Sequence, residues 1–351
     1  MRIALSCCGE GFGHASRLIS LYEELKDRYT ISIFCPSTVS PYIRGKIPDA
    51  EINYTPRFTF LKENGKINCL GTLRRNITTL ALMPQSVHRL YRRLKHLDIE
   101  AVVTDFDPFT SLAAKKGRIP VLELNHPGII LRRFSLSPEA LLSKMVVRFM
   151  ESFYNQKICC SFYGSHHGPL IRREITSERP TRKDFYLVYL NGISLEDVRR
   201  LLEPFAGIPF QIFPDPKSNF QKALVSCKGV ITTAGHQLIS ESIYLEKPLF
   251  VVPLKSQFEQ RLNAKMVERS GWGMQGSLKN FQETLSRFLA ERDSFPRPEQ
   301  DRHTRFCFTN DKDHIIDSME DFFQEAKARN RRISQTGLIR PPLKLFLQTK
   351  Q

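Results

Sequence analysis

A histidine and two aspartates stand at the ends of apolar runs, where they could carry out proton transfer. The sequence GEGFGH (residues 9–14) follows the first apolar run and ends in His14, and Asp105 and Asp107 follow the run 102–104. A neutral imidazole accepts a proton, and a carboxylate beside it orients the ring and stabilises its charged form. We therefore predict that His14 is a general base and that Asp105 or Asp107 assists it.

These residues also have a purely structural interpretation. His14 could cap or hydrogen-bond the glycine-rich loop, and either aspartate could cap only the helix that follows it. If His14 lies in the first turn of a helix, the partial positive charge there disfavours the imidazolium ion. We therefore expect the His14 ring to be neutral near pH 7.

Further polar residues follow another apolar run, at Asn125 and His126. Ligands of open parallel sheets bind at the carboxyl ends of the strands, and glycines let the backbone approach a ligand closely. We predict that Gly11 and Gly13 line an acceptor site together with Asn125 and His126. The last two could equally form only the turn before Pro127.

The second half of the chain contains residues suited to phosphate and hydroxyl groups. An apolar run ends in the small-residue loop 232–235, and a helix is predicted to begin directly after it. Free N–H groups at the start of a helix bind phosphate, and carboxylates and amides further on accept hydrogen bonds from hydroxyls. The predicted donor-binding residues are Thr233, Gly235, His236, Gln237, Glu241, Glu259 and Gln260.

Alternating strand and helix patterns would position all these residues. Short apolar runs are followed by apolar residues at helical spacing, as at Leu18, Leu21 and Leu25. Such alternation is typical of a parallel sheet covered by helices on both faces, so we predict an α/β fold with two doubly wound, Rossmann-like domains. The expected strands are 2–7, 30–35, 101–104, 120–124, 157–162, 185–190, 209–213, 229–232 and 249–252, and the expected later helices are 85–97, 109–116, 195–202, 238–245, 261–269 and 313–328.

A polar segment with prolines divides the two series of elements. Residues 167–183 follow neither periodicity, and we predict that they form the linker. We expect an N-terminal acceptor-binding domain at 1–166, a C-terminal donor domain at 184–312, and a helix with a basic tail at 313–351. A length of 351 residues suits two domains of ordinary size.

Composition and charge restrict the class of protein. Hydrophobic residues make up 41% and charged residues 25% of the chain, as in folded soluble proteins. The longest apolar runs, such as 248–253, are too short to span a bilayer, and the chain starts directly with a strand pattern, so we expect a cytoplasmic location. The net charge of +16 predicts a polyanionic partner, either nucleic acid or anionic lipid.

The cysteines and the basic stretches support further expectations. The eight cysteines lie mostly among apolar neighbours, so we predict reduced core residues. No Cys and His spacing fits a zinc site, and we predict no metal site. The apolar, Arg-rich stretch 70–97 suggests docking on an anionic membrane surface.

The glycine-rich loop and the second-half loop together resemble those of GT-B glycosyltransferases. The likeness is strongest to the branch that contains the bacterial N-acetylglucosaminyltransferase of peptidoglycan synthesis and the UDP-glycosyltransferases. In that branch the first glycine-rich loop ends in a histidine, as GEGFGH does, and a donor motif follows a small-residue loop. The residues that match the donor motif in order are Thr232–Gly235, Ser240-Glu241, Lys247-Pro248, Pro253, Glu259-Gln260 and Asn263.

This resemblance covers residues 1–310 and implies a fold and an activity. Two domains would face a cleft, the first binding the acceptor and the second a nucleotide-sugar, usually a UDP-sugar. The reaction implied is an inverting transfer of a hexosyl or N-acetylhexosaminyl group to a hydroxyl, with no required metal or other cofactor. The basic surface suggests in addition a lipid-linked acceptor and peripheral attachment to the inner face of the cytoplasmic membrane.

The resemblance also implies roles for individual residues by position. His14 would be the base or an acceptor-site residue, with one of the two aspartates as its orienting carboxylate. Glu241 would bind the ribose. The remaining implied contacts are Gly235 and His236 with the pyrophosphate, and Glu259 and Gln260 with the donor sugar.

Two other functions stay open from the sequence. A nucleotide-sugar hydrolase of nonulosonate-type biosynthesis has a similar first loop and donor domain, and His14 would there activate water. A basic nucleic-acid-binding protein would use the fold only as a scaffold and would bind in a salt-dependent way. The chain has no recognised nucleic-acid motif, so we do not expect nucleic acid as a partner.

Overall fold

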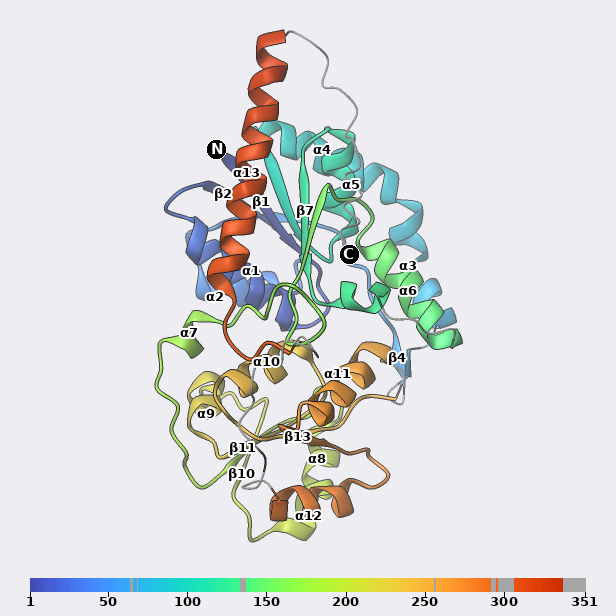
Figure 1. The fold of residues 1–351 in the computed structure, drawn as a ribbon. Helices are drawn as coiled ribbons and strands as arrows, with labels where there is room; N and C mark the ends of the chain where they lie inside the picture. Colours follow the sequence, from blue (N-terminus) through green and yellow to red (C-terminus); the bar gives the residue numbers. More distant parts are fainter. Residues whose placement is uncertain are drawn as a thin grey trace. The chain divides into compact units, whose positions relative to one another are not determined.

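The chain folds into two compact units. The structure is a computed structural model, and it describes residues 1–63, 66–67, 69–132, 137–255, 257–291, 295 and 306–336. Unit 1 consists of Met1–Leu61, Asn68–Cys160 and Lys312–Gln351, and unit 2 consists of Lys62–Ile67 and Ser161–Asp311 (Figure 1). Each unit contains its own parallel sheet, and the two are described separately below.

Unit 1 contains a six-stranded sheet in the order β3-β2-β1-β6-β7-β8, in which every neighbouring pair is parallel. This is the order of a doubly wound sheet, in which the direction of winding reverses between β1 and β6. β6 and β7 are buried along their whole length, as expected for central strands covered on both faces. The strands are β1 (Arg2–Cys7), β2 (Thr30–Cys35), β3 (Glu51–Tyr54), β6 (Ala101–Asp105), β7 (Val121–Asn125) and β8 (Gln156–Cys159).

Helices α4 and α5 cover part of this sheet with rows of apolar residues. On one face, Leu90 and Leu94 of α4 and Phe109 of α5 pack into a common core with Ala4 and Val102 of the strands. The helices of unit 1 are α1 (Phe12–Leu25), α2 (Ser40–Lys46), α3 (Cys69–Ala81), α4 (Met83–His96), α5 (Pro108–Lys116), α6 (Pro138–Met150), α13 (Lys312–Thr336) and the short 3-10 helix η1 (Pro127–Arg132).

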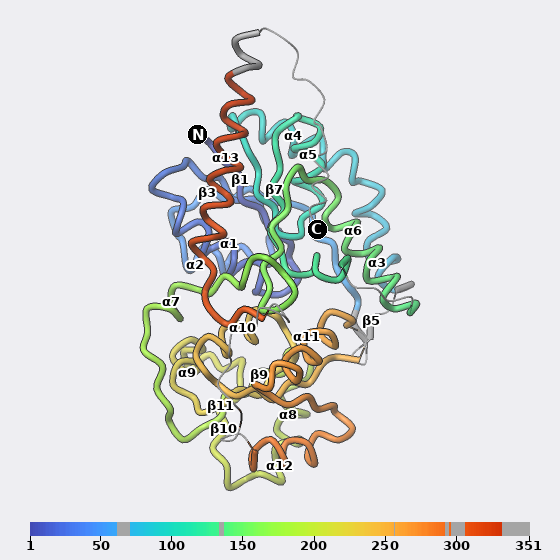
Figure 2. The backbone as a smooth tube through the Cα atoms, viewed as in Figure 1, coloured from blue at the N-terminus to red at the C-terminus, as the bar shows by residue number. Residues whose placement is uncertain are grey.

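The late helix α13 belongs to unit 1 although it follows unit 2 in the sequence. It runs beside α1 (Figure 2), where Phe323 packs against Tyr29 with ring centroids 4.9 Å apart. The Lys312 ammonium donates to Glu24 at 3.2 Å, and Met319 is fully buried. The sequence predicted a terminal helix at 313–328, and the structure shows that it completes the core of unit 1.

Unit 2 contains a five-stranded parallel sheet in the order β10-β9-β11-β12-β13. Its winding reverses between β9 and β11, which places the loops after these two strands at a topological switch point. The strands are β9 (Tyr186–Tyr189), β10 (Phe210–Ile212), β11 (Gly229–Thr232), β12 (Leu249–Val251) and β13 (Gly273–Gln275), with the antiparallel pair β4 (Lys62–Glu63) and β5 (Lys66–Ile67). The helices are α7 (Arg173–Thr176), α8 (Leu195–Leu202), α9 (Phe220–Ser226), α10 (His236–Tyr244), α11 (Phe258–Arg269), α12 (Phe281–Glu291) and the short η2 (Glu203–Phe205).

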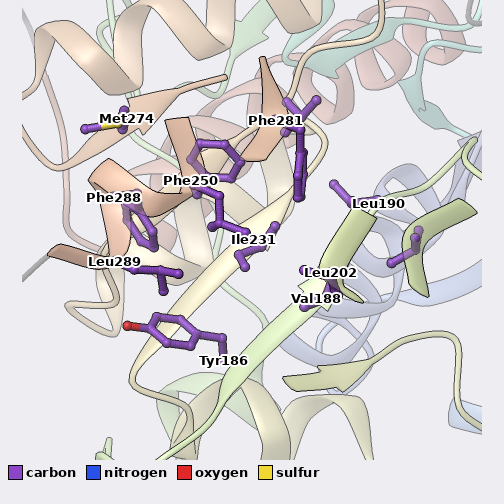
Figure 3. Close-up of a cluster of buried hydrophobic side chains, with 13 residues drawn as sticks. Tyr186, Val188, Leu190, Leu202, Ile231, Phe250, Met274, Phe281, Phe288 and Leu289 are labelled. Atoms are coloured by element: carbon purple, nitrogen blue, oxygen red, sulfur yellow. The ribbon is translucent and has the colours of Figure 1, made fainter. Parts of the chain in front are cut away.

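The core of unit 2 is largely aromatic. Phe250 of β12 lies edge-on to Phe281, with ring centroids 5.5 Å apart, and contacts Phe288 at 5.7 Å (Figure 3). Tyr186 and Ile231 complete the row along β9 and β11. Tilted and edge-to-face rings are the preferred packing of aromatic pairs, so this cluster fixes the sheet against α12.

The predicted α/β class with two doubly wound sheets is confirmed. The segment predicted to be the linker, 167–183, lies inside unit 2, and the chain passes from unit 1 to unit 2 at Cys160–Ser161. Its backbone N–H groups at Thr181 and Lys183 donate to carbonyls of the α9 region at 3.1 and 2.7 Å. Loop segments packed through their backbone show no side-chain periodicity, which explains its appearance in the sequence.

Other expectations concern membranes, cysteines and the tail. None of the described helices is both long and apolar enough to cross a bilayer. Cys7, Cys8 and Cys35, like three later cysteines, are buried and reduced, and the reduced Cys307 is partly exposed. The basic tail from residue 337 onward lies outside the described residues.

Candidate active site

The strand order of unit 1 brings the GEGFGH loop next to the aspartates. β1 and β6 are neighbours at the switch point, and their register pairs Cys7 with Asp105. Gly11 is the N-cap of α1 and has φ 78°, a backbone conformation that side chains disfavour. α1 begins at Phe12, so His14 lies in its first turn, as predicted.

His14, Asp105 and Arg17 form one hydrogen-bonded cluster. The His14 ring donates from Nδ1 to Asp105 Oδ1 at 2.7 Å. Arg17 donates from Nε to Asp105 Oδ2 at 2.7 Å and from Nη2 to Oδ1 at 3.0 Å. His14 and Arg17 are three residues apart on α1 and share one face of the helix. Asp105 and Arg17 are buried, and the His14 side chain is 14% exposed.

The charges of this cluster overturn one prediction. Burial alone would lower the pKa of His14, but Cys8 and the Asp105 carboxylate outweigh it and raise the pKa well above its usual value. Burial alone would raise the pKa of Asp105, yet Arg17 and His14 hold it below its usual value. The expectation of a neutral His14 near pH 7 is therefore wrong, because a carboxylate 2.7 Å away outweighs the helix N-terminus.

The ring of Phe106 supports His14 from one side. The two rings are stacked, with centroids 5.8 Å apart and planes at 4°. Phe106 has φ 64°, a left-handed conformation that costs a non-glycine residue about 1 kcal/mol or more. Its N–H donates to Glu123 Oε1 at 3.0 Å. The backbone conformation that places this ring is thus secured by a buried carboxyl group.

Asp107 caps a helix and, unlike Asp105, is not shown in contact with His14. It is the N-cap of α5, where its carboxylate accepts from the Phe109 N–H at 3.0 Å and from the Thr110 hydroxyl at 2.5 Å. Burial raises its pKa to about 6, although these hydrogen bonds oppose the shift. These contacts of Asp107 correspond to the capping alternative, whereas Asp105 contacts His14.

Asn125 and His126 are buried rather than open to a ligand in this structure. The Asn125 amide donates to Glu123 at 2.5 Å and to Glu151 at 3.0 Å, and its carbonyl oxygen accepts from the Gly128 N–H at 2.8 Å. The side chain therefore closes the turn before η1 and holds two carboxyl groups. This arrangement matches the turn interpretation of the sequence.

In unit 2, hydrogen bonds from buried side chains fix the small-residue loop between β11 and α10. Gly235 is the N-cap of α10, and its described contacts include no side-chain cap. The Asn263 amide donates to the Ala234 carbonyl at 3.0 Å, and the Tyr163 hydroxyl donates to Asn263 at 2.8 Å. Thr233 is buried in this loop. The first N–H groups of α10 lie at the switch point of the sheet, as the phosphate-binding interpretation requires.

Glu241 of α10 forms a buried ion pair with Arg172. The guanidinium donates from Nε to Oε1 at 2.6 Å and from Nη2 to Oε2 at 2.5 Å, a bidentate arrangement. Gln237 donates to Glu241 at 2.8 Å and to the Leu170 carbonyl at 3.0 Å. Glu241 has no exposed surface in this structure. A ribose contact at Glu241 therefore stays a prediction and requires this network to open or to share the carboxylate.

The remaining donor-site residues have mixed surroundings. The His236 ring stacks on Phe162 with centroids 5.7 Å apart and lies 3.3 Å from the Ser240 hydroxyl, so its side chain is directed into unit 2. Gln260 accepts from the Leu254 N–H at 2.9 Å and closes the loop before α11. Glu259 lies in the first turn of α11 and is partly buried.

Sequence reasoning missed four residues of these sites. Arg17 carries a detectable signal, because it lies three positions after His14 on a predicted helix. Phe106 and Glu123 show no signal, since neither a left-handed conformation nor its support can be read from residue type. Arg172 lies in the segment predicted to be the linker. Among the described residues, no three His, Cys, Asp or Glu side chains form a cluster that could hold a metal ion.

Comparisons with known proteins agree with this architecture. A model of glycosyl transferase family 1 matches residues 1–292. An uncharacterized glycosyltransferase of Methanosarcina acetivorans is 21% identical over 325 residues, which cover 78% of this chain and 85% of that protein. The calicheamicin glycosyltransferase CalG4 has 15% identity and a TM-score of 0.59, covering 92% of this chain and 98% of CalG4. Acinetobacter baumannii MurG has 14% identity and a TM-score of 0.58, covering 91% and 99%. The fold is that of the GT-B glycosyltransferases.

Proposed function

We propose a specific reaction for this chain, which belongs to glycosyl transferase family 1 and is a glycosyltransferase. In this reaction the enzyme transfers a hexosyl or N-acetylhexosaminyl group from a UDP-sugar to a hydroxyl acceptor, with inversion at the anomeric carbon. The observation that carries the proposal is the buried cluster of His14, Asp105 and Arg17 at the switch point of unit 1. It provides one base with a fixed orientation, which is what a single displacement at the anomeric carbon needs.

In the proposed reaction, His14 Nε2 takes the proton of the acceptor hydroxyl. The acceptor oxygen forms a bond to the anomeric carbon while the bond from that carbon to the phosphate oxygen breaks, and UDP leaves with the electron pair. The imidazolium ion that forms is stabilised by Asp105, to which Nδ1–H already donates. Arg17 keeps that carboxylate in place by two hydrogen bonds. Only molecules with a deprotonated Nε2 are competent, so the raised pKa of His14 favours activity above neutral pH.

The proposed donor site lies in unit 2, at the loop 233–235 and the start of α10. The N–H groups and the dipole at this helix terminus would stabilise the charge that develops on the departing diphosphate. Glu241 would bind the ribose, and Glu259 with Gln260 the sugar. These roles rest on the donor motif in the sequence and on the position of the loop at a switch point.

The proposed transfer uses no metal or other cofactor. Stabilisation of the leaving diphosphate would come from backbone N–H groups of α10 instead. Addition of EDTA should therefore leave the rate unchanged, and a loss of activity that Mg²⁺ or Mn²⁺ restores would contradict this part. We further propose a lipid-linked acceptor and a place on the inner face of the cytoplasmic membrane, for which the net charge of +16 is the support.

The donor is tested by thermal unfolding with UDP, ADP, GDP and CMP in parallel. A nucleotide at about 100 times its dissociation constant stabilises a protein by about 2.7 kcal/mol, which is readily visible. We expect UDP alone to raise the melting temperature. Equal stabilisation by all four nucleotides would refute a uridine-selective site, and a shift with only another nucleotide would change the donor.

The reaction type is tested by product analysis with a panel of UDP-sugars, with and without hydroxyl acceptors. Transfer predicts a β-configured product from an α-linked donor and little free sugar without an acceptor. Release of free sugar at the same rate in both conditions would instead favour a nucleotide-sugar hydrolase, in which His14 activates water. His14→Gln should remove either activity while nucleotide binding is kept.

A further inference from the structure

Two successive residues, Asp105 and Phe106, contact the same ring of His14. Asp105 is the last residue of β6 and accepts from His14 Nδ1, and the Phe106 ring stacks on the imidazole. Successive side chains of an extended strand point to opposite faces of the sheet, so a continued strand would direct one of the two away from His14. Phe106, with φ 64°, leaves the extended conformation directly after Asp105. The left-handed turn at Phe106 therefore allows both side chains to contact the imidazole.

These two contacts restrict His14 in different ways. The hydrogen bond to Asp105 fixes one ring atom, Nδ1, but still permits rotation about the axis of that bond. The Phe106 ring is buried and lies nearly parallel to the imidazole, with the planes at 4°, so it restricts this rotation. Together the two contacts determine the direction of Nε2, the atom that would take the proton of the acceptor.

The backbone conformation of Phe106 is unfavourable by itself. A left-handed conformation strains any residue with a side chain, whereas glycine adopts it freely. Among the described residues other than glycine, Phe106 is the one apolar residue with a positive φ, and the others are Asp98, Arg118 and Glu246. Strained residues persist where the surrounding structure holds them, and they concentrate at functional sites. The strain at Phe106 therefore indicates both a supporting group and a use for the ring.

Glu123 of β7 provides this support. The register of β6 and β7 pairs Glu123 with Thr104, two residues before Phe106. Glu123 Oε1 accepts from the Phe106 N–H at 3.0 Å and from the Asn125 amide at 2.5 Å, and Oε2 pairs with the Thr104 hydroxyl. The side chain has no exposed surface. Glu123 is thus fixed at both carboxyl oxygens and holds the Phe106 N–H from the neighbouring strand.

The Glu123 carboxyl group is neutral below pH 7. Burial, together with the Glu151 carboxylate, raises the pKa of Glu123 to about 8. Glu151 itself is paired with Lys157, which donates to it at 2.6 Å. A neutral carboxyl group has one oxygen that accepts and one O–H that donates, and the amide of glutamine offers the same two functions. Glu123→Gln is therefore a close mimic of the neutral side chain.

We propose that Glu123 is a positioning residue for the His14 base and acts through the backbone and the ring of Phe106. Without the carboxyl group, the Phe106 N–H loses its acceptor, the backbone leaves the left-handed conformation, and the ring moves away from His14. The imidazole then rotates about its bond to Asp105, and Nε2 no longer keeps one direction. The proposal rests on the proposed role of His14 as the base. The ring contact is measured without nucleotide or acceptor, so the two proposals can fail separately.

Proton NMR of the His14 imidazole at pH 6 tests the proposal. His14→Gln identifies the imidazole signals by their absence. Phe106→Leu removes the aromatic ring and gives the part of the chemical shift that the ring current causes. Glu123→Leu should move the His14 signals in the same direction and by about the same amount, although the phenylalanine is still present. Glu123→Gln should leave them in place, because the amide still accepts from the Phe106 N–H. None of the replacements at Glu123 changes a charge at this pH, since the carboxyl group is neutral.

Two further variants separate positioning from a general loss of stability. Leu94→Ala removes a fully buried side chain from the core that α4 and α5 share, so it should lower the melting temperature and leave the His14 signals in place. Glu123→Asp keeps a carboxyl group but withdraws it from the Phe106 N–H, so it should move the signals as Glu123→Leu does, and it decides the question if Glu123→Leu does not fold.

Four results would overturn the proposal. The first is an unchanged His14 signal in folded Glu123→Leu or in Glu123→Asp. The second is a shift in Glu123→Gln as large as in Glu123→Leu, because the hydrogen bond to Phe106 would then not be the cause. The third is an equal shift in Leu94→Ala, which would indicate general loosening of unit 1. The fourth is the absence of any effect of Phe106→Leu, because the ring would then not contact His14 in solution.

Discussion

Replacing Asp105 by asparagine keeps the shape of the side chain and removes its charge. The carboxylate accepts the Nδ1–H of His14 at 2.7 Å, and it is one of the two groups, with Cys8, that raise the pKa of the ring. Without it, the pKa of His14 should fall, because burial then lowers the pKa and its strongest carboxylate partner is lost. A base that loses its orienting carboxylate also loses the correct tautomer, and we expect the limiting kcat/KM to fall about 10²-fold to 10⁴-fold.

The size of the effect on stability follows from Arg17. Asp105→Asn leaves this buried guanidinium without its anionic partner, and breaking a buried ion pair on one side costs about 3–5 kcal/mol. The double variant Arg17→Met with Asp105→Asn removes both charges and should recover most of that loss. The double variant is the control for folding. It should be nearly as stable as the unchanged protein, yet the pKa of His14 should still be lowered in it because the Asp105 carboxylate is absent.

The assay is an NMR titration of the His14 imidazole, which needs no substrate. In the unchanged protein the ring should titrate well above its usual pH, and in Asp105→Asn it should titrate at lower pH. Once a substrate pair is known, kcat/KM should rise with pH through the same pKa, because the base acts in its deprotonated form. An unchanged titration of His14 in Asp105→Asn would refute the assignment of Asp105 as the group that sets its basicity.

Three further changes have distinct expected outcomes. Burial raises the pKa of Glu123 to about 8, so its stabilising contribution is present at low pH and is lost as pH rises from the unfolded value near 4.3 through 8. Glu123→Gln should therefore raise the free energy of unfolding at pH 8 relative to pH 5, as measured by urea denaturation, and equal effects at both pH values would contradict this. Glu241→Ala should destabilise the folded protein by about 3–5 kcal/mol, because it leaves Arg172 buried without a partner. The double variant Glu241→Ala with Arg172→Met should recover this stability but not UDP binding. Recovered UDP binding in the double variant would contradict the proposed contact between Glu241 and the ribose. Gly11→Ala should lower the free energy of unfolding by about 1 kcal/mol because φ is 78° at this residue, even though no atom lies within 4 Å of the added carbon. Gly45→Ala is the control in the same melting experiment. Gly45 lies in helix α2 and has equally open surroundings, so this variant should not lose stability.

The parts of the fold that could be predicted from sequence are those that depend on local periodicity. β1 and β2 occur at the predicted residues because their side chains are buried on both faces and read as continuous apolar runs. The pairing of His14 with an aspartate was predictable too, since parallel strands bring their carboxyl ends to one edge. The choice between Asp105 and Asp107 was not, because it depends on which residue the following helix uses as its cap.

Contacts between distant segments could not be predicted from the sequence. Arg172 and Glu241 are 69 residues apart, and no local pattern connects them. The raised pKa of His14 depends on a contact across 91 residues, whereas the helix N-terminus that suggested a lowered pKa is local. The left-handed Phe106 is similarly stabilised by a carboxyl group from the next strand. In each case a residue type is visible in the sequence and its partner is not.

The position of α13 affects how the protein is made. Unit 1 contains residues from before and after the continuous stretch Ser161–Asp311, so it cannot be completed until that stretch has been synthesised. Phe323 and Met319, both buried in unit 1, arrive only with α13. During translation the later unit 2 can therefore close before the earlier unit 1, and a fragment ending at Cys160 would expose the apolar surface that α13 covers.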